Sequence, residues 1–326
     1  MSQPMKAEPV QDALDAWLAS VGFGHHEARP LSGDVSPRRY ARLVREDGSS
    51  AILATYPPEV RSVCPRFLHT TELLTRAGVP VPRVLASDCD EGWMLVEDLG
   101  LQTLGEWGQD RPWSELTPWF ERGLDLADRI ARLPVEGLAD LNPVLGRELL
   151  RKELAQTWDL FLEPRGLTGD ASLTRALSEA LDAICANLGA ETPVPCHRDF
   201  MVRNLMPLPD GELVVLDHQD LRFGPPAYDL ASLLNDTLFP PPEVEAALLG
   251  RHPVDPVRYH RAAAQRTLKA IGTYASFARR GADRHLPLVP PTLARCLEHL
   301  SRVPESADLA AGLARAWAPV LGPAEA

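Results

Sequence analysis

The segment between residues 193 and 220 constrains the fold more than any other part of the chain. It contains two short apolar runs, Leu205 to Leu208 and Leu213 to Leu216, joined by Pro209-Asp210-Gly211, which is a turn signal. From residue 115 onward the rest of the chain shows helical periodicity, as in the run from Leu173 to Leu188. We therefore expect a hairpin embedded in a mostly helical region.

Three polar residues are placed around this hairpin in a chemically useful order. Asp199 ends the tripeptide His-Arg-Asp, Asn204 follows five residues later, and Asp217 comes directly after the second apolar run. Phosphoryl transfer needs a carboxylate that orients the attacking hydroxyl and oxygen ligands that hold Mg²⁺ on the nucleotide. Each residue alone has an ordinary explanation: a chance tripeptide, a loop residue and a strand terminator. Their combined spacing favours an enzyme that uses ATP and Mg²⁺.

The first hundred residues differ from the rest of the chain in their pattern of apolar residues. Runs with strand character cover Tyr40 to Arg45, Ala51 to Tyr56 and Trp93 to Glu97, with Asp47-Gly48 as a hairpin turn between the first two. A helix is expected from Pro65 to Ala77. The fold class is therefore α+β, with a small antiparallel-sheet lobe over residues 1–97 and a larger, mainly helical lobe over residues 98–326.

Composition excludes several classes of protein. The formal charge of -12 and the lack of a Lys/Arg-rich run argue against nucleic acid binding. No apolar stretch reaches the ~18 residues of a membrane span, and residues 1–10 lack the apolar core of a secretion signal. We expect a cytoplasmic monomer that does not bind membranes. Its five scattered cysteines are expected to be reduced thiols.

Two longer stretches carry a resemblance to a known family. The segments H-R-D-F-M-V-R-N-L-M and L-D-H-Q-D-L-R-F-G-P-P-A-Y-D-L-A-S-L-L, from His197 and Leu216 onward, resemble the aminoglycoside phosphotransferase/choline kinase superfamily. The spacing of D-x-Q-D, G-P-x-x-Y-D-L and S-L-L is most similar to the anomeric sugar kinases that act on N-acetylmuramate and N-acetylglucosamine in bacterial cell-wall recycling. The resemblance implies a bilobal, protein-kinase-like fold, ATP and Mg²⁺ as cofactors, and a small-molecule sugar substrate.

The resemblance also implies roles for residues of the hairpin region. Asp199 matches the base that orients the sugar hydroxyl, and Asn204 and Asp217 match the Mg²⁺ ligands. Asp229 matches a residue that supports the catalytic loop, although a simple helix-start charge explains it equally well. His197 is expected to brace the loop by hydrogen bonds rather than to bind zinc.

A nucleotide site is expected in the first lobe. The turn from residue 31 to residue 39 has residue types that let backbone N–H groups approach phosphates, but it is also compatible with a plain surface turn. The segment from Met94 to Asp98 is expected to act as the adenine hinge, or else to be a plain buried strand. The strand from Ala51 to Tyr56 lacks the lysine that protein kinases place there, and an arginine is a candidate replacement. The expected nucleotide-binding residues are Ser32, Gly33, Ser36, Arg39, Arg42, Val96 and Glu97.

Candidate sugar contacts lie in the second lobe. Arg266 and Lys269 are three residues apart on a predicted helix, where they face either an acidic group of the substrate or solvent. Trp158 is a candidate stacking residue or a core residue. Met201-Val202 and His218 depart from the subgroup's usual residues, which leaves the sugar open. The full set of candidates is Asp220, Arg203, Trp158, Arg266 and Lys269.

Two alternative functions remain from the sequence. Another small-molecule kinase of the aminoglycoside or choline type would need an acidic pocket for its cationic substrate, which Arg266 and Lys269 disfavour. A nucleotide-binding pseudokinase is suggested only by the missing strand lysine. Asp199, Asn204 and Asp217 are all present, and they count against a pseudokinase.

Overall fold

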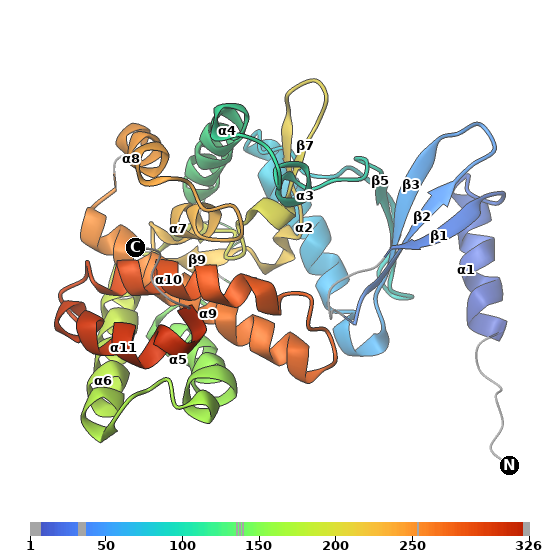
Figure 1. The fold of residues 1–326 in the computed structure, drawn as a ribbon. Coiled ribbons are helices and arrows are strands. Elements are labelled where there is room, and N and C mark those ends of the chain that lie inside the picture. Colours follow the sequence, from blue (N-terminus) through green and yellow to red (C-terminus); the bar gives the residue numbers. More distant parts are fainter. Residues whose placement is uncertain are drawn as a thin grey trace, which may run out of the picture. The chain divides into compact units, whose positions relative to one another are not determined.

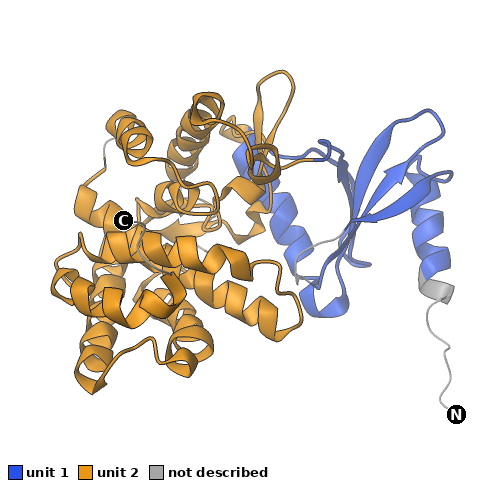
Figure 2. Cartoon of the chain, viewed as in Figure 1, with its two compact units in different colours: residues 1–75, 81–101 blue, residues 76–80, 102–326 orange. Residues whose placement is uncertain are grey.

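The computed structural model describes residues 8–31, 37–134, 136, 138, 140–252 and 254–321. These residues form two compact units, drawn in blue and orange in Figure 2. The first unit comprises the described residues up to Thr75 together with Val81–Leu101. The second comprises Arg76–Pro80 and the described residues from Gln102 onward. The first unit contains the sheet and the second is mainly helical, as the α+β prediction requires (Figure 1).

The first unit is built on a five-stranded antiparallel sheet with the strand order β1-β2-β3-β5-β4. The three predicted strands are confirmed as β2, β3 and β5, to within one residue at each end. The turn at Asp47-Gly48 is also confirmed, since the Gly48 N–H donates to the Arg45 carbonyl at 3.0 Å. The strands are β1 (Glu27–Leu31), β2 (Arg39–Val44), β3 (Ser50–Thr55), β4 (Val84–Asp88) and β5 (Trp93–Glu97).

Each face of this sheet packs against one helix. Alternate side chains of a strand point to opposite faces, so Ala51 and Leu53 join the cluster under α1 (Glu8–Ser20). Ala54 of the same strand joins the cluster under α2 (Val63–Arg76), the helix predicted from Pro65 to Ala77. Removal of this apolar area from water, at about 25 cal/mol per Å², holds the helices on the sheet.

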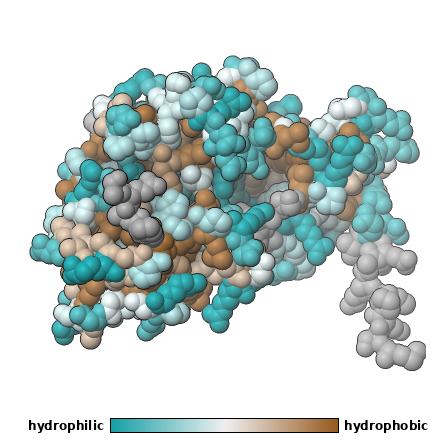
Figure 3. Space-filling model, in the orientation of Figure 1, coloured by the Kyte–Doolittle hydropathy of each residue, from teal (hydrophilic) through white to brown (hydrophobic). Residues whose placement is uncertain are grey.

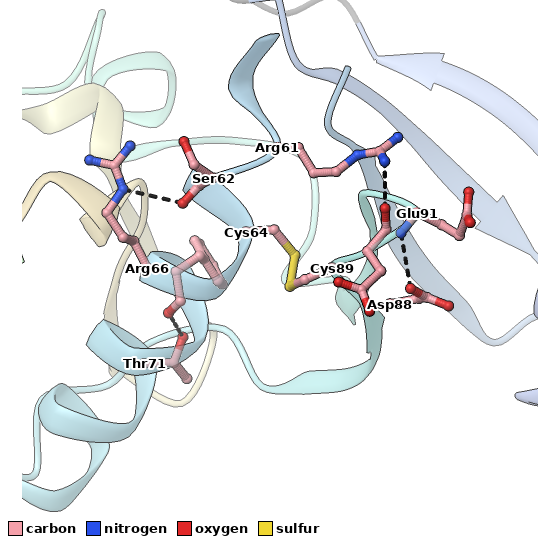
Figure 4. Close-up of a disulfide and its surroundings, with 10 residues drawn as sticks. Arg61, Ser62, Cys64, Arg66, Thr71, Asp88, Cys89 and Glu91 are labelled. Atoms are coloured by element: carbon pink, nitrogen blue, oxygen red, sulfur yellow. Dashed lines mark hydrogen bonds between the residues drawn. A yellow bond between two sulfur atoms is a disulfide. The ribbon is translucent and has the colours of Figure 1, made fainter. Parts of the chain in front are cut away.

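The expectation that all five cysteines are reduced is wrong for two of them. Cys64, at the start of α2, and Cys89, in the turn between β4 and β5, form a disulfide with a Cα–Cα distance of 5.5 Å (Figure 4). The turn is brought to the helix by hydrogen bonds, including one from Arg61 to the carbonyl of Asp90. The remaining cysteines, Cys185, Cys196 and Cys296, are free and buried.

The second unit is assembled around α9 (Pro256–Arg279), which packs against α5, α7 and α10 (Figure 1). Gly272 of α9 permits the close approach of α5, because a Cβ at this position would lie 2.8 Å from the backbone nitrogen of Thr157. The other helices of four or more residues are α3 (Leu104–Trp107), α4 (Trp113–Ala131), α5 (Arg147–Thr157), η2 (Trp158–Leu162), α6 (Ala171–Gly189), α7 (Tyr228–Leu234), α8 (Pro242–Arg251), α10 (Val289–Leu300) and α11 (Ala310–Leu321).

The predicted hairpin is confirmed within this helical unit. Strands β7 (Leu205–Pro207) and β8 (Leu213–Val215) pair antiparallel, and Gly211 adopts a positive φ of 89° in the turn between them. Outside the hairpin, β6 (Val194–Cys196) pairs with β9 (Arg222–Gly224). This second pairing, which the sequence analysis does not predict, closes the segment that carries the candidate catalytic residues.

Within the described ranges no helix is both long and apolar enough to cross a membrane. Hydrophilic and hydrophobic residues are interspersed over the face drawn in Figure 3.

Candidate active site

The loop after β6 is fixed by a carboxylate from a neighbouring helix. Asp229, the second residue of α7, accepts the backbone N–H of His197 at 2.6 Å and that of Arg198 at 2.9 Å. Arg198 has a positive φ of 76°, which is uncommon for a residue with a side chain and costs about 1–3 kcal/mol. Burial raises the pKa of Asp229, and the two N–H donors oppose this rise. The loop therefore adopts a strained turn that α7 holds in place.

His197 joins the two arms of this segment. Its ring is buried, and Nε2 donates to the carbonyl oxygen of Leu216 at 2.8 Å. Leu216 lies directly before Asp217, so this bond connects the start of the loop with the end of the hairpin. Throughout the described part of the chain, no group of three or more His, Cys, Asp or Glu side chains could hold a metal ion.

Asn204 lies close to Asp199 and to the strand that precedes Asp217. Its Nδ2 donates to the backbone carbonyl of Asp199 at 2.9 Å, and its own carbonyl accepts the N–H of Leu216 at 2.8 Å. Asp217 has a left-handed φ of 56°, and its Oδ1 accepts from Nε2 of Gln219 at 2.9 Å. The spacing seen in the sequence thus corresponds to hydrogen bonds that link Asn204 to Asp199 and to the residue directly before Asp217.

Three cations surround the carboxylate of Asp199. Lys269 Nζ lies 2.8 Å from Oδ1, Arg266 Nη2 lies 3.6 Å from the same oxygen, and Arg198 Nη1 lies 3.8 Å from Oδ2. Burial alone would raise the pKa of Asp199, but these cations outweigh it and hold the pKa well below its usual range. Arg266 and Lys269 are 3% and 8% exposed, so the alternative of a solvated charged helix face is wrong.

Glu153 of α5 belongs to the same cluster, although the sequence analysis does not identify it. Its Oε1 lies 2.8 Å from Nη2 of Arg198 and 3.6 Å from Nζ of Lys269. Burial raises the pKa of Glu153, but Lys269 and Arg198 outweigh burial and lower it. No motif marks this glutamate, because it lies 45 residues before Arg198 on an ordinary helix. Glu153 is half-buried, and its part in the cluster follows from the packing of α5 on α9, which the sequence does not show.

The other candidates for sugar binding lie at different places in the second unit. Asp220 is close to the cluster, since its Oδ2 lies 2.7 Å from Nη1 of Arg198. Arg203 instead pairs with the buried Asp236 at 3.1 Å. Trp158 is half-buried at the start of η2. Because its side chain is uncharged, it takes no part in the ion pairs around Asp199.

The expected nucleotide residues of the first unit are described in part. Ser32, Gly33 and Ser36 lie outside the described residues. Arg39 is exposed at the start of β2. Arg42, on the same strand, forms a two-pronged ion pair with Asp98, with Nε and Nη2 2.6 and 2.9 Å from the two carboxylate oxygens.

The Asp98 carboxylate is held by hydrogen bonds from more than one residue. Its Oδ2 also accepts from Ser50 Oγ at 2.7 Å. Burial would raise the pKa of Asp98, but the hydrogen bonds from Arg42 and Ser50 outweigh it and lower the pKa. In this arrangement the Arg42 guanidinium is matched by a carboxylate through two parallel hydrogen bonds.

Val96 and Glu97 lie at the end of β5, between β3 and β4. The N–H of Glu97 donates to the carbonyl of Arg83 at 2.9 Å, and the Glu97 side chain accepts from the backbone and side chain of Arg83. Because the Glu97 N–H is used inside the sheet, any adenine contact made here would use the carbonyl of Glu97 or groups that follow it.

Comparison with known proteins places the chain among phosphotransferases. A sequence profile of the phosphotransferase enzyme family matches residues 27–264. The N-acetylmuramate/N-acetylglucosamine kinase of Pseudomonas aeruginosa is 33% identical over 335 aligned positions, which cover 95% of this chain and 96% of that protein.

Two solved structures share the fold at low sequence identity. The choline kinase LicA from Streptococcus pneumoniae superimposes with a TM-score of 0.62 at 15% identity, covering 89% of this chain and 99% of that one. An ADP-bound aminoglycoside phosphotransferase, APH(2'')-Ib, gives a TM-score of 0.61 at 16% identity, covering 90% and 99%. With a matched profile over most of its length and a relative at this level of identity, the chain belongs to the phosphotransferase enzyme family.

Proposed function

We propose that the chain is an ATP-dependent kinase that phosphorylates the anomeric hydroxyl of an amino sugar, N-acetylmuramate or N-acetylglucosamine. The proposal depends on one observation above all: Asn204 is joined by direct hydrogen bonds to Asp199 and to Leu216, the residue before Asp217. The name of the Pseudomonas aeruginosa relative supports the choice of sugar. Nucleotide binding is assigned to residues 1–97, and acceptor binding and catalysis to residues 98–326.

In the proposed reaction, Asp199 orients the sugar hydroxyl toward the γ-phosphorus of ATP. The hydroxyl oxygen forms a bond to phosphorus, the bond from phosphorus to the bridging oxygen breaks, and ADP leaves with that electron pair. The hydroxyl proton passes to the carboxylate of Asp199 and then to solvent. An anomeric hydroxyl is more acidic than an ordinary alcohol, so a carboxylate that is a weak base is adequate for this step.

Asn204 and Asp217 would hold Mg²⁺. An amide oxygen and a carboxylate are the hard ligands that this ion prefers, and Mg²⁺ commonly takes its other ligands from substrate phosphates and water. Nδ2 of Asn204 is used in the bond to Asp199, which assigns Oδ1 to the ion. When bound, Mg²⁺ would neutralise charge on the β- and γ-phosphates.

The experiment that tests this function offers Mg-ATP and a panel of acceptors to the full chain and measures ADP release. We expect turnover of N-acetylglucosamine and N-acetylmuramate and none of their 1-O-methyl glycosides, which lack the anomeric hydroxyl. Equal turnover of a free sugar and its methyl glycoside would show that another hydroxyl is phosphorylated. Turnover of choline or an aminoglycoside alone would replace the amino sugar with a cationic acceptor.

A further inference from the structure

Helix α9 delivers two cations to a single oxygen of Asp199. Lys269 Nζ and Arg266 Nη2 lie 2.8 and 3.6 Å from Oδ1. They can share this target because residues three apart on a helix lie on one face. The other carboxylate oxygen, Oδ2, has the Arg198 guanidinium at a longer distance of 3.8 Å. The two oxygens of the carboxylate are therefore not equivalent.

The asymmetry leaves one oxygen for the acceptor. The side chain of Asp199 is 26% exposed, whereas those of Arg266 and Lys269 are only 4% and 10% exposed. Arg266 is fixed further by a bond from its Nε to Ser232 Oγ at 3.1 Å. Oδ1 is thus engaged by two buried cations, while the one cation near Oδ2 among these three lies 3.8 Å away.

Lys269 and Arg266 already have carboxylate partners without a substrate. Lys269 lies within 4 Å of both Asp199 and Glu153, and Arg266 lies within 4 Å of Asp199. Asp220 is shared by Arg198 and Arg222. A substrate carboxylate placed against Lys269 or Arg266 would compete with Asp199 for a cation that is already paired, and both anions would have to be buried beside it.

We infer that Lys269, assisted by Arg266, is a positioning residue that holds Oδ1 of Asp199 so that Oδ2 faces the acceptor hydroxyl, and that neither cation binds the acidic group of a substrate. This inference rests on the proposed function. It changes the role expected for these two residues from binding the sugar to orienting the carboxylate. The two cations then favour no acidic sugar over a neutral one.

Lys269→Met, an apolar replacement of similar length, tests the inference in the full chain. Because the side chain acts through Asp199, we expect kcat to fall at least thirtyfold with N-acetylglucosamine and with N-acetylmuramate alike, while KM for ATP changes less than threefold. Lys269→Arg, which keeps the charge, should recover at least a third of the lost rate. A KM for N-acetylmuramate that rises tenfold or more, with the neutral sugar unaffected, would overturn the inference, because N-acetylmuramate alone carries a carboxylate.

A double-mutant cycle keeps the test decisive if Lys269→Met is unstable. In Asp199→Asn the carboxylate is absent, so adding Lys269→Met restores the wild-type net charge of the cluster and should lower kcat by less than threefold. A further tenfold loss in that background would mean that Lys269 acts independently of Asp199, against the inference. If the wild-type chain phosphorylates neither sugar, the proposed function fails, and the same cycle is run with the acceptor that the panel identifies.

Discussion

The carboxylate of Asp229 illustrates how one side chain can fix a catalytic loop. Two backbone N–H groups, those of His197 and Arg198, point at its two oxygens from a turn that is strained at Arg198. A buried N–H without a partner costs about 1–3 kcal/mol, which is as much as the strain itself. Without the carboxylate, we expect the turn before Asp199 to lose its strained conformation.

The variant Asp229→Asn keeps the shape of the side chain and replaces one acceptor with an amide donor. We expect the free energy of unfolding to fall by about 1–3 kcal/mol, because one buried N–H loses its partner. We also expect kcat to fall by about a hundredfold, the scale expected for a misplaced catalytic group. Urea unfolding and ADP release measure the two effects. The control Asp159→Asn changes an exposed aspartate of η2 and should alter neither the free energy of unfolding nor kcat. An unchanged kcat in Asp229→Asn would show that Asp229 does not position the loop.

At the residue scale the sequence could group Asp199, Asn204 and Asp217 because they lie within one short segment, and the structure links Asn204 by hydrogen bonds to Asp199 and to Leu216. The partners of Asp199 are less accessible to such reasoning. Lys269 is 70 residues from Asp199, and whether it faces solvent, substrate or a carboxylate depends on how α9 packs. Sequence reasoning does not identify Glu153 for the same reason. Charge balance within a buried cluster is a property of the tertiary structure.

Single elements differ in how readily they could be predicted. The strands found from the sequence, β2, β3 and β5, are the inner strands of the sheet, and each has at least one buried residue. The two that were not found, β1 and β4, are the edge strands. Every residue of β1 except its last is exposed, and it contains Pro30, which an edge strand tolerates. The place of such a strand is set by its hydrogen bonds to the neighbouring strand, and its own residues show no alternation of buried and exposed side chains.

A pair of histidines connects two helices of the second unit. His260 of α9 and His299 of α10 have their Nδ1 atoms 2.9 Å apart, and Nε2 of His299 lies 2.7 Å from Oδ1 of Asn235. Because the Asn235 oxygen accepts the proton of Nε2, Nδ1 of a neutral His299 must accept from His260. A second proton on His299 would require His260 to give up its Nδ1 proton and accept instead. Burial lowers the pKa of His299 well below its usual value, and Arg295 lowers it further.

This arrangement predicts a loss of stability in mild acid. Below a pKa of about 6.5 the unfolded chain binds a proton at His299 that the folded protein does not, so the free energy of unfolding falls as pH falls. Between pH 7.5 and pH 5.5 this residue should account for a loss of about 1.4 kcal/mol. His299→Gln should be less stable at pH 7.5 but show a pH dependence smaller by that amount.

Urea unfolding at the two pH values measures the difference. His25→Gln, which changes an exposed histidine of the first unit, is the control and should retain the full pH dependence. A His299→Gln variant with the pH dependence of the wild type would show that His299 is protonated in the folded state.

For the whole molecule, the two units have separate means of stabilisation. The second has the long helix α9 at its centre, while the first has two small clusters, one on each face of a sheet. The disulfide lies entirely within the first unit and joins its helix α2 to the turn that follows β4. The sequence could not indicate this bond, because Cys64 and Cys89 are 25 residues apart and match no known spacing.

The disulfide should stabilise the first unit selectively. Closing a loop of 25 residues in the unfolded chain is worth about 3–4 kcal/mol in the chain-entropy account. In the double variant Cys64→Ser/Cys89→Ser we therefore expect backbone amides of β3, β5 and α2 to exchange faster with solvent, whereas those at the centre of α9 keep their rates. Hydrogen exchange resolves the units because it reports local opening. A thiol reductant should produce the same acceleration in the wild type and none in the variant. Equal acceleration in α9 would show that the two units unfold together and that the bond stabilises the whole chain.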